Sequence, residues 1–370
     1  MSLGNFHKLL RFGFAFSVSP WYDPGKRAFK YRTFNRAYSA CLIGFFLASY
    51  LFGLVHLECN NKSGFLGGKF ASLEIISTSS MATMYLLFRL NRRKTNAWRR
   101  LLDNLLLVEE ILYSAFGVTL TESFNYLLIP TQLTVVVGYL WYYIYYAENV
   151  QTFGKSQGNA FEKFIWLDIS RCISLLVCLI CGALMKISRM RFVALNEEMK
   201  RMQLTGRNRN IKALKVCYGR LLDNIRLYNE IFGSFIFCSI VKTTVEFQGF
   251  LTYFIQYEYF SGLHPIRYVY KSGMSSFLSW FCSVYTIFSC DSVAKELAET
   301  RRSCFELYLK SLDDWSIDSQ QDISDVLELL ASDPKFSAGN FFEIRREVVL
   351  NMLNVATAYV LVTVQLKGKN

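Results

Sequence analysis

The chain has 370 residues and a mean hydropathy of +0.21; 52% of its residues are hydrophobic, 16% are aromatic and only 19% are charged. A soluble protein of this length usually carries more charge and fewer aromatic side chains. A net charge of +12 could suggest a nucleic-acid partner, but nucleic-acid binders gather their basic residues on one domain. Here the basic residues lie between apolar stretches, which favours a membrane protein and argues against nucleic acid.

Residues 1–37 are rich in basic and aromatic side chains. They do not show the basic, apolar and small-residue regions of a signal peptide in that order, so we expect a cytoplasmic arm. An apolar stretch at 38–57 predicts the first membrane span, and a second at 70–90 ends before three basic residues. Residues 98–116 carry leucines at helical spacing, and we expect an amphipathic helix that continues the second span into the cytoplasm.

The rest of the chain alternates apolar spans with short outer loops and long basic segments. The third span ends in a cluster of Tyr and Trp residues, which is typical of a membrane interface. The segments 186–230 and 291–347 are expected to be largely helical and to lie in the cytoplasm. No internal repeat is present, so residues 1–370 are predicted to form one all-α membrane domain. Its seven predicted spans are 38–57, 70–90, 127–147, 161–185, 231–257, 271–290 and 348–366.

The Lys and Arg residues near the span ends set the expected orientation. Alternate loops, counted from the N-terminus, carry thirty of the 41 basic residues; the other loops carry eight, and three lie within spans. Because cytoplasmic loops hold the excess, we predict a cytoplasmic N-terminus and an extracellular C-terminus. This orientation is the reverse of that of a G-protein-coupled receptor, and we find neither the Asp-Arg-Tyr nor the Asn-Pro-x-x-Tyr motif of that class in its expected place.

The final span has no charged residue from Val348 to Leu366 and would cover about 28 Å, close to one hydrocarbon thickness. A turn of 100° per residue places seven residues on one face of this helix. They are Asn351, Asn354, Val355, Ala358, Val362, Gln365 and Leu366. Three of them are carboxamides, which are costly in hydrocarbon without a partner or water. This face, the amide stripe, is therefore predicted to contact another helix or to line an aqueous path.

The end of this span resembles the C-terminal signature of insect gustatory receptors, in which Thr-Tyr is followed by five mostly apolar residues and Gln-Phe. Tyr359 and Gln365 match that signature, while Ala358 stands in place of the Thr and Leu366 in place of the Phe. The ending Val-Gln-Leu-Lys at 364–367 is also similar to the olfactory co-receptor of the same superfamily. Seven spans with a cytoplasmic N-terminus are the topology of that superfamily.

The resemblance implies a multi-pass taste receptor of a sensory neuron's plasma membrane that acts as a ligand-gated, poorly selective cation channel. It implies tetramers, of one chain or mixed with other gustatory receptors, with a pore lined by the seventh span and an anchor built from the cytoplasmic segments. Val362 and Leu366 would then close the path by dewetting, and Gln365 would coordinate ions or hold the closed state. Tyr359, at the edge of the amide stripe, is expected to support it by packing. The divergent motif favours a bitter-type or orphan receptor.

The resemblance also implies a pocket for a small-molecule tastant in the outer halves of the spans before the last. An aromatic box with a few polar groups suits such a ligand. The candidate residues are Tyr139, Tyr143, Trp166, Asp168, Gln248, Tyr253, Gln256, Ser276, Phe277 and Trp280. For each of them, ordinary packing or interfacial anchoring is the alternative.

Two pairs of opposite charges lie inside the predicted spans, Asp168 with Arg171 and Lys242 with Glu246. At spacings of three and four residues each pair can meet on one helix face, either as a structural ion pair or as a functional position. A Cys-x-x-Cys at 178–181 has no second pair, which favours packing over a metal site. No cofactor is expected.

The sequence contains no H-E-x-x-H, P-loop or G-x-G-x-x-G motif, so neither catalytic residues nor an enzymatic activity is predicted. Asn61, in an Asn-Lys-Ser sequon, lies in the expected first outer loop, 58–69, and is a candidate glycosylation site. Because that loop is short and close to the membrane, an unused sequon is the alternative. Two alternatives to a channel remain, a non-conducting chemosensory subunit that needs a partner and a membrane transporter. A transporter predicts paired, interrupted spans around a midplane site, and the sequence shows neither.

Overall fold

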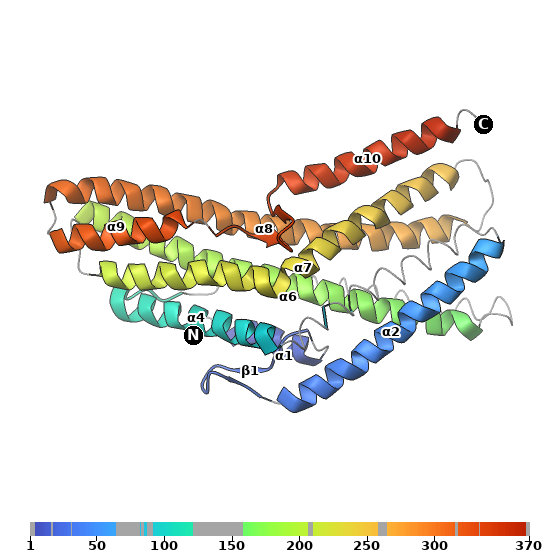
Figure 1. Ribbon diagram of the computed structural model, residues 1–370, viewed down its shortest axis with the longest axis horizontal. Coiled ribbons are helices and arrows are strands. Elements are labelled where there is room, and N and C mark those ends of the chain that lie inside the picture. The colour runs from blue at the N-terminus through green and yellow to red at the C-terminus, as the bar shows by residue number, and fades with distance from the viewer. Residues whose placement is uncertain are drawn as a thin grey trace.

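The computed structural model describes residues 4–15, 18–30, 32–63, 82, 85–86, 92–120, 158–205, 210–257, 265–314, 317–332 and 334–367. The described chain is an elongated bundle of helices with two short hairpins (Figure 1). Three helices are much longer than the others, namely α6 (Gly158–Thr205), α7 (Ile211–Tyr257) and α8 (Pro265–Asp314). The all-α fold predicted from the sequence is confirmed.

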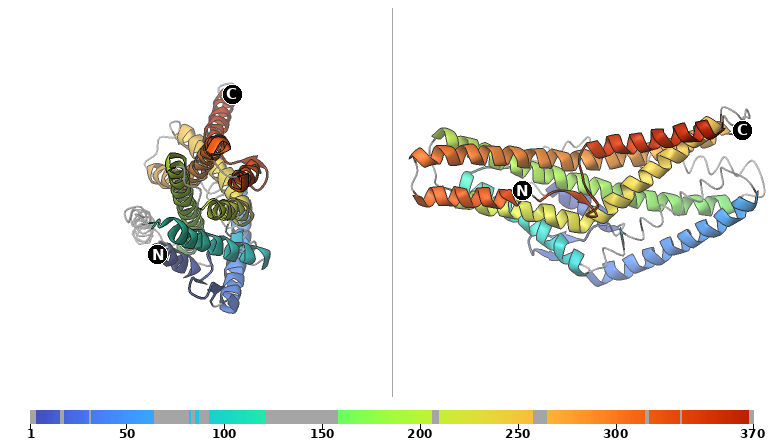
Figure 2. Two further views of the ribbon diagram at one scale, coloured as in Figure 1. Left: turned by 90° about the vertical axis from the view of Figure 1, so that its left-hand side faces the viewer. Right: turned by 45° about the horizontal axis from the view of Figure 1, so that its top comes forward.

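Each of the three long helices is more than twice as long as a membrane is thick. With 48, 47 and 50 residues they extend about 70–75 Å, against about 30 Å of hydrocarbon. One part of each helix can therefore cross a bilayer, while the other part must lie beyond it. The parts predicted to be cytoplasmic lie side by side at one end of the bundle (Figures 1 and 2).

The same end of the bundle contains α4 (Arg92–Phe116), which packs on α7, and α9 (Ile317–Ala331), which packs on α7 and α8. We call this end of the bundle the anchor. It consists of α4, α9 and the parts of α6, α7 and α8 beside them. Leucines of α4 recur every three or four residues, and Leu101, Leu102, Leu105 and Leu112 are buried together with Trp98. The amphipathic helix predicted at 98–116 is therefore confirmed, and it begins earlier, at Arg92.

At the other end, α2 (Arg32–Ser63) and α10 (Glu347–Lys367) lie with the halves of the long helices that are predicted to cross the membrane (Figure 1). These elements correspond to the first, fourth, fifth, sixth and seventh predicted spans. The second and third spans, 70–90 and 127–147, lie outside the described residues apart from positions 82, 85 and 86.

Length and apolar composition single out one stretch among the described residues as able to cross a membrane, Ile173–Thr205 within α6. Two shorter apolar stretches are Arg36–Ala48 in α2 and Glu347–Val362 in α10. The last of these overlaps the span predicted at 348–366.

The helices extend beyond several of the predicted spans. Helix α2 continues to Ser63, into the segment expected to be the first outer loop at 58–69, which places Asn61 in the last turns of that helix. Helix α8 begins at Pro265, before the span predicted at 271–290; proline is favoured in a first helical turn, where its missing N–H would have no helical partner. The basic segment 186–230 is helical as predicted, but it is divided between α6 and α7.

The basic N-terminal arm is folded against α6 and α4, which the sequence did not predict. Helix α1 (Gly4–Ala15) packs on α6, and a hairpin of β1 (Tyr22–Asp23) and β2 (Ala28–Phe29) follows it. The Tyr22 hydroxyl donates a hydrogen bond to the Asp103 carboxylate of α4. Burial and this carboxylate raise the pKa of Tyr22, so the phenol stays protonated and can keep donating.

A second antiparallel hairpin, β3 (Ser337–Ala338) with β4 (Phe342–Glu343), joins α9 to α10. Its turn contains Gly339 and Asn340 at φ of 60° and 64°, and these are residue types that tolerate left-handed backbone. The hairpin packs on α7. It therefore connects the anchor to the base of the seventh span.

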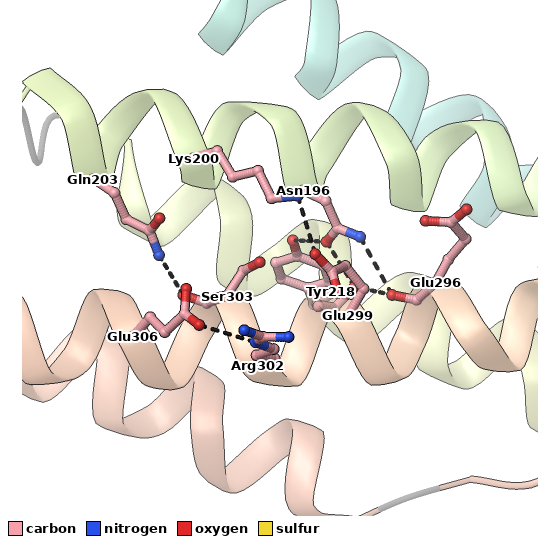
Figure 3. Close-up of polar contacts among 10 residues, drawn as sticks. Asn196, Lys200, Gln203, Tyr218, Glu296, Glu299, Arg302, Ser303 and Glu306 are labelled. Atoms are coloured by element: carbon pink, nitrogen blue, oxygen red, sulfur yellow. Dashed lines mark hydrogen bonds and ion pairs between the residues drawn. The ribbon is translucent and has the colours of Figure 1, made fainter.

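Helices α6 and α8 are joined in the anchor by a row of polar contacts (Figure 3). The Asn196 amide donates to the carbonyl of Glu296 at 3.3 Å, and its oxygen accepts from the Thr300 hydroxyl at 2.7 Å. Two turns along α6, the Gln203 amide donates to the carbonyl of Ser303 at 2.7 Å. Such bonds have strict geometry, so they fix how the two helices align.

Candidate functional site

The amide stripe of α10 lies on the surface of the chain. Its members Asn351, Asn354, Val355, Ala358, Val362 and Gln365 are all exposed. The side chain of Leu366 lies outside the described part of the chain. The stripe is thus one continuous open face of α10, in agreement with the helical spacing.

The opposite face of α10 attaches it to the rest of the chain. Val349, Met352 and Ala356 are buried, and α10 packs mainly on α7. Tyr359, at the edge of the stripe, is exposed. The carboxamides of the stripe therefore do not join α10 to the described helices of its own chain. Outside the described helices, a second copy of the chain, lipid or water can be their neighbour.

The three candidate ligand residues on α8 differ in burial. Ser276 is buried, and its hydroxyl donates to the backbone carbonyl of Glu246 at 3.3 Å. Trp280 is partly buried and packs against the core. Phe277 is 61% exposed and lies on the surface. The structure therefore brings Ser276 and Trp280 to one side of α8 and separates Phe277 from them.

The predicted ion pair on α7 is confirmed. The Lys242 ammonium lies 2.8 Å from Oε1 of Glu246, and the two side chains are 7% and 8% exposed. The same ammonium donates to the Ser279 hydroxyl of α8 at 3.3 Å. The lysine of the pair therefore links α7 to α8 at this point, while both carboxylate oxygens of Glu246 are buried without a hydrogen-bond partner among the described residues.

A row of hydroxyl groups extends this contact between α7 and α8. Thr243 and Ser283 lie 2.8 Å apart, and Ser239 and Ser283 lie 3.1 Å apart. The sequence did not single out these residues, because Ser and Thr in an apolar stretch carry no charge. Together with the ion pair they form a buried polar seam beside Ser276 and Trp280. The seam can orient the two helices or receive polar groups of a small ligand.

The remaining candidate ligand residues are only partly covered by the structure. Gln248 lies on α7 and is partly buried. Four more lie on described helices, but their side chains lie outside the described part of the chain. They are Trp166 and Asp168 on α6, and Tyr253 and Gln256 on α7. Tyr139 and Tyr143 lie outside the described residues altogether.

The thiols and acids of the described chain offer no ready site for a metal. Within that part, no group of three or more His, Cys, Asp or Glu side chains could hold a metal ion. Cys178 and Cys181 are buried in the core. In the anchor, burial raises the pKa of Cys217 and of Cys304 to about 12, so these thiols stay protonated at neutral pH.

Comparison with known proteins agrees with this architecture. The family described as 7tm Chemosensory receptor matches residues 6–370. No curated protein matches the chain. The insect olfactory receptor OR5 from Machilis hrabei is similar at a TM-score of 0.70 and 14% identity, over 98% of this chain and 97% of that chain. The same receptor in complex with eugenol is similar at a TM-score of 0.58 and 12% identity, over 98% of each chain. At such identities the likeness shows the fold.

Proposed function

The chain belongs to the 7tm chemosensory receptor family, and from this premise we propose that it is a taste receptor acting as a ligand-gated, poorly selective cation channel. Membership of the family makes it a membrane receptor rather than an enzyme. The proposed pore lies where the α10 helices of four copies meet. In this proposal the chain crosses the plasma membrane of a sensory neuron seven times, with its N-terminus in the cytoplasm and its C-terminus outside.

The exposed amide stripe is the observation that carries the proposal. A carboxamide that faces lipid loses its hydrogen bonds to water, at a cost of about 1–3 kcal/mol for each group. Around a shared axis, the three amides of each copy keep water or cations as partners. Val362 and Leu366 then form the apolar constriction near the outer end, and Gln365 lies between them on the path of the ion. Asn351, Asn354 and Ala358 line the path below.

The anchor offers a surface on which copies can associate. Phe305, Leu309 and Leu312 of α8 are exposed, and their spacing places them on one helix face. This part of α8 is predicted to lie in the cytoplasm, where a row of large apolar side chains in water favours association. The row supports a tetramer, either of this chain alone or with related receptors.

The proposed ligand is a small amphipathic organic tastant, of the bitter type or of an orphan class. Ser276, Trp280 and the Lys242–Glu246 pair combine aromatic surface with a few polar groups between α7 and α8. That combination is typical of small-molecule sites. The similar OR5 receptor was solved in complex with eugenol, which supports a small organic ligand here.

Gln365→Ala tests the pore assignment. The variant removes one ion-facing amide from every copy, so we expect single-channel conductance to change by roughly twofold or more, or the open probability to shift comparably. Patch-clamp recording from cells that express the chain, alone and with a related receptor, measures both. Thr357→Val is the matched control, because Thr357 is exposed on α10 outside the stripe and its hydroxyl donates to the Leu353 carbonyl of its own helix at 2.9 Å.

Equal effects of the two substitutions would argue against a pore along the stripe. Surface expression without current, both alone and with a related receptor, would overturn the channel and favour a non-conducting subunit. Ligand-dependent uptake without channel openings would instead favour a transporter.

A further inference from the structure

The base of α10 is attached to two different helices of its own chain. Residues 334–346 lead from α9 to α10 through the β3–β4 hairpin. The hairpin binds α7, and Arg346, the last residue before α10, binds α8. Above this base, α10 packs mainly on α7 (Figure 1). An ion pair to α8 thus lies at the base of α10.

Asn229 of α7 holds the hairpin with both ends of its carboxamide. Its nitrogen donates to the Lys335 carbonyl at 2.6 Å, and its oxygen accepts from the Ser337 N–H at 3.0 Å. Gly233, one turn further along α7, lets the hairpin backbone approach. A Cβ at that position would lie 3.0 Å from the Ser337 carbonyl oxygen, which is tighter than most such contacts. The hairpin is therefore packed tightly against α7.

Arg346, which follows this hairpin, contacts α8. Its Nε lies 2.6 Å from Oδ2 of Asp291, and its guanidinium carbon lies 5.0 Å from the centre of the Phe288 ring. Lys295 is a second cation beside Asp291, at 3.3 Å. A planar guanidinium can pair with a carboxylate and lie over an aromatic ring at once, which fixes its position better than charge alone.

Asp291 shares one unbroken helix with the candidate ligand residues. Helix α8 runs from Pro265 to Asp314, and Trp280 precedes Asp291 by eleven residues, or about 16 Å. A ligand that displaces α8 near Trp280 therefore also displaces the partner of Arg346. Because the hairpin keeps the base of α10 on α7, a movement of α8 relative to α7 must tilt or rotate α10.

We propose that the Arg346–Asp291 pair transmits movement of α8 to the pore helix and holds α10 in its ligand-free position. The inference rests on the proposed channel function and deepens it, since it concerns the control of the same pore. Arg346 acts as a positioning residue, because it lies below the amide stripe and acts through α10. Loss of the pair should change gating and leave the permeation path unaltered.

Arg346→Gln removes the charge and keeps part of the side-chain stem. We expect basal current to rise and the half-maximal ligand concentration to fall, each by roughly two- to fivefold, which is the range of a half-exposed ion pair. Single-channel conductance and ion selectivity should stay unchanged. Asp291→Asn, which is nearly isosteric, should act in the same direction. The double variant should shift no further than the stronger single variant, because both substitutions remove the same contact between Arg346 and Asp291.

Arg345→Gln is the matched control. Arg345 is the neighbouring residue and is similarly exposed, at 53% against 49% for Arg346. Its guanidinium pairs with Glu343 of the same hairpin at 2.8 Å. We expect this variant to leave basal current and the half-maximal ligand concentration unchanged.

Hydrogen exchange on the purified protein tests the link between α8 and α10 without recording a current. Arg346→Gln and Asp291→Asn should speed the exchange of backbone amides in the first turns of α10, and Arg345→Gln should not. If the wild type conducts and both variants leave current, ligand response and exchange unchanged, the link is refuted while the channel stands. If the wild type carries no current and hydrogen exchange still responds as expected, the channel function fails and the link between α8 and α10 is supported.

Discussion

A cysteine at position 362 should make the current of this chain sensitive to a thiol reagent applied from outside. Val362 lies near the C-terminal end of the amide stripe and is 52% exposed. A cationic reagent attached in four copies would fill a narrow path, so we expect the current of Val362→Cys to fall at least roughly tenfold. Whole-cell recording before and after the reagent measures the effect, and the wild-type current should not change.

Val360→Cys is the matched control for this experiment. Val360 is partly buried and lies about 200° around α10 from Val362, on the side that faces the rest of the chain. A Cys59→Ser background removes the thiol predicted to lie on the outer side. The buried anchor thiols react slowly, because their raised pKa keeps them protonated. Equal block at 360 and 362, or no block at 362, would contradict the proposed pore.

Arg191→Met should strongly destabilise the anchor. The Arg191 side chain is fully buried and pairs with Glu109 of α4 at 2.8 Å. It also donates to the carbonyls of Leu105 at 3.1 Å and Ile187 at 3.0 Å. Removing one member of a buried pair leaves the other charge buried without its partner. This lowers the free energy of unfolding by about 3–5 kcal/mol. We expect little protein at the cell surface and an apparent melting temperature at least about 5 °C lower in detergent.

Arg189→Met provides the comparison, because Arg189 lies two residues away on α6. Its side chain is 52% exposed and pairs with Glu296 at 3.0 Å. An exposed pair of this kind contributes about 0–1 kcal/mol, so surface expression and melting temperature should stay close to wild type. If Arg191→Met is as stable as Arg189→Met, the buried pair does not hold α4 to α6.

The helices of this fold could be predicted from the sequence because their signals are local. Leucines at helical spacing predicted the helix at 98–116, and a charge-free run predicted the last span. The two hairpins could not be predicted in this way. The β3–β4 hairpin has strands of two residues each, and it is held by Asn229 more than a hundred positions earlier in the chain. A contact of that range leaves no periodic pattern.

Counting basic residues in each loop also fails to predict the contacts of single residues. In the sequence, Arg191 and Arg346 both count as cytoplasmic charges that orient the chain. In the structure Arg191 is buried in the anchor, and Arg346 joins the base of α10 to α8. A count of charges cannot separate these roles, because they depend on which carboxylate the fold brings within reach.

The candidate pore and the candidate ligand site differ in how far the sequence could define them. The amide stripe follows from helical geometry on a single element, so its described members share one exposed face. The ligand residues come from several spans, and their grouping depends on how those spans pack. Ser276 and Phe277 are adjacent in the sequence, yet one is buried against α7 and the other lies on the surface.

Cation flux into liposomes that contain the purified chain tests the central claim most directly. The chain is reconstituted alone and with a related receptor, and a panel of small organic tastants is applied. We predict ligand-dependent cation entry that Gln365→Ala alters and that an outside thiol reagent blocks in Val362→Cys. Absence of flux under every condition, in a preparation where a related receptor conducts, would contradict the account of this chain as a ligand-gated channel.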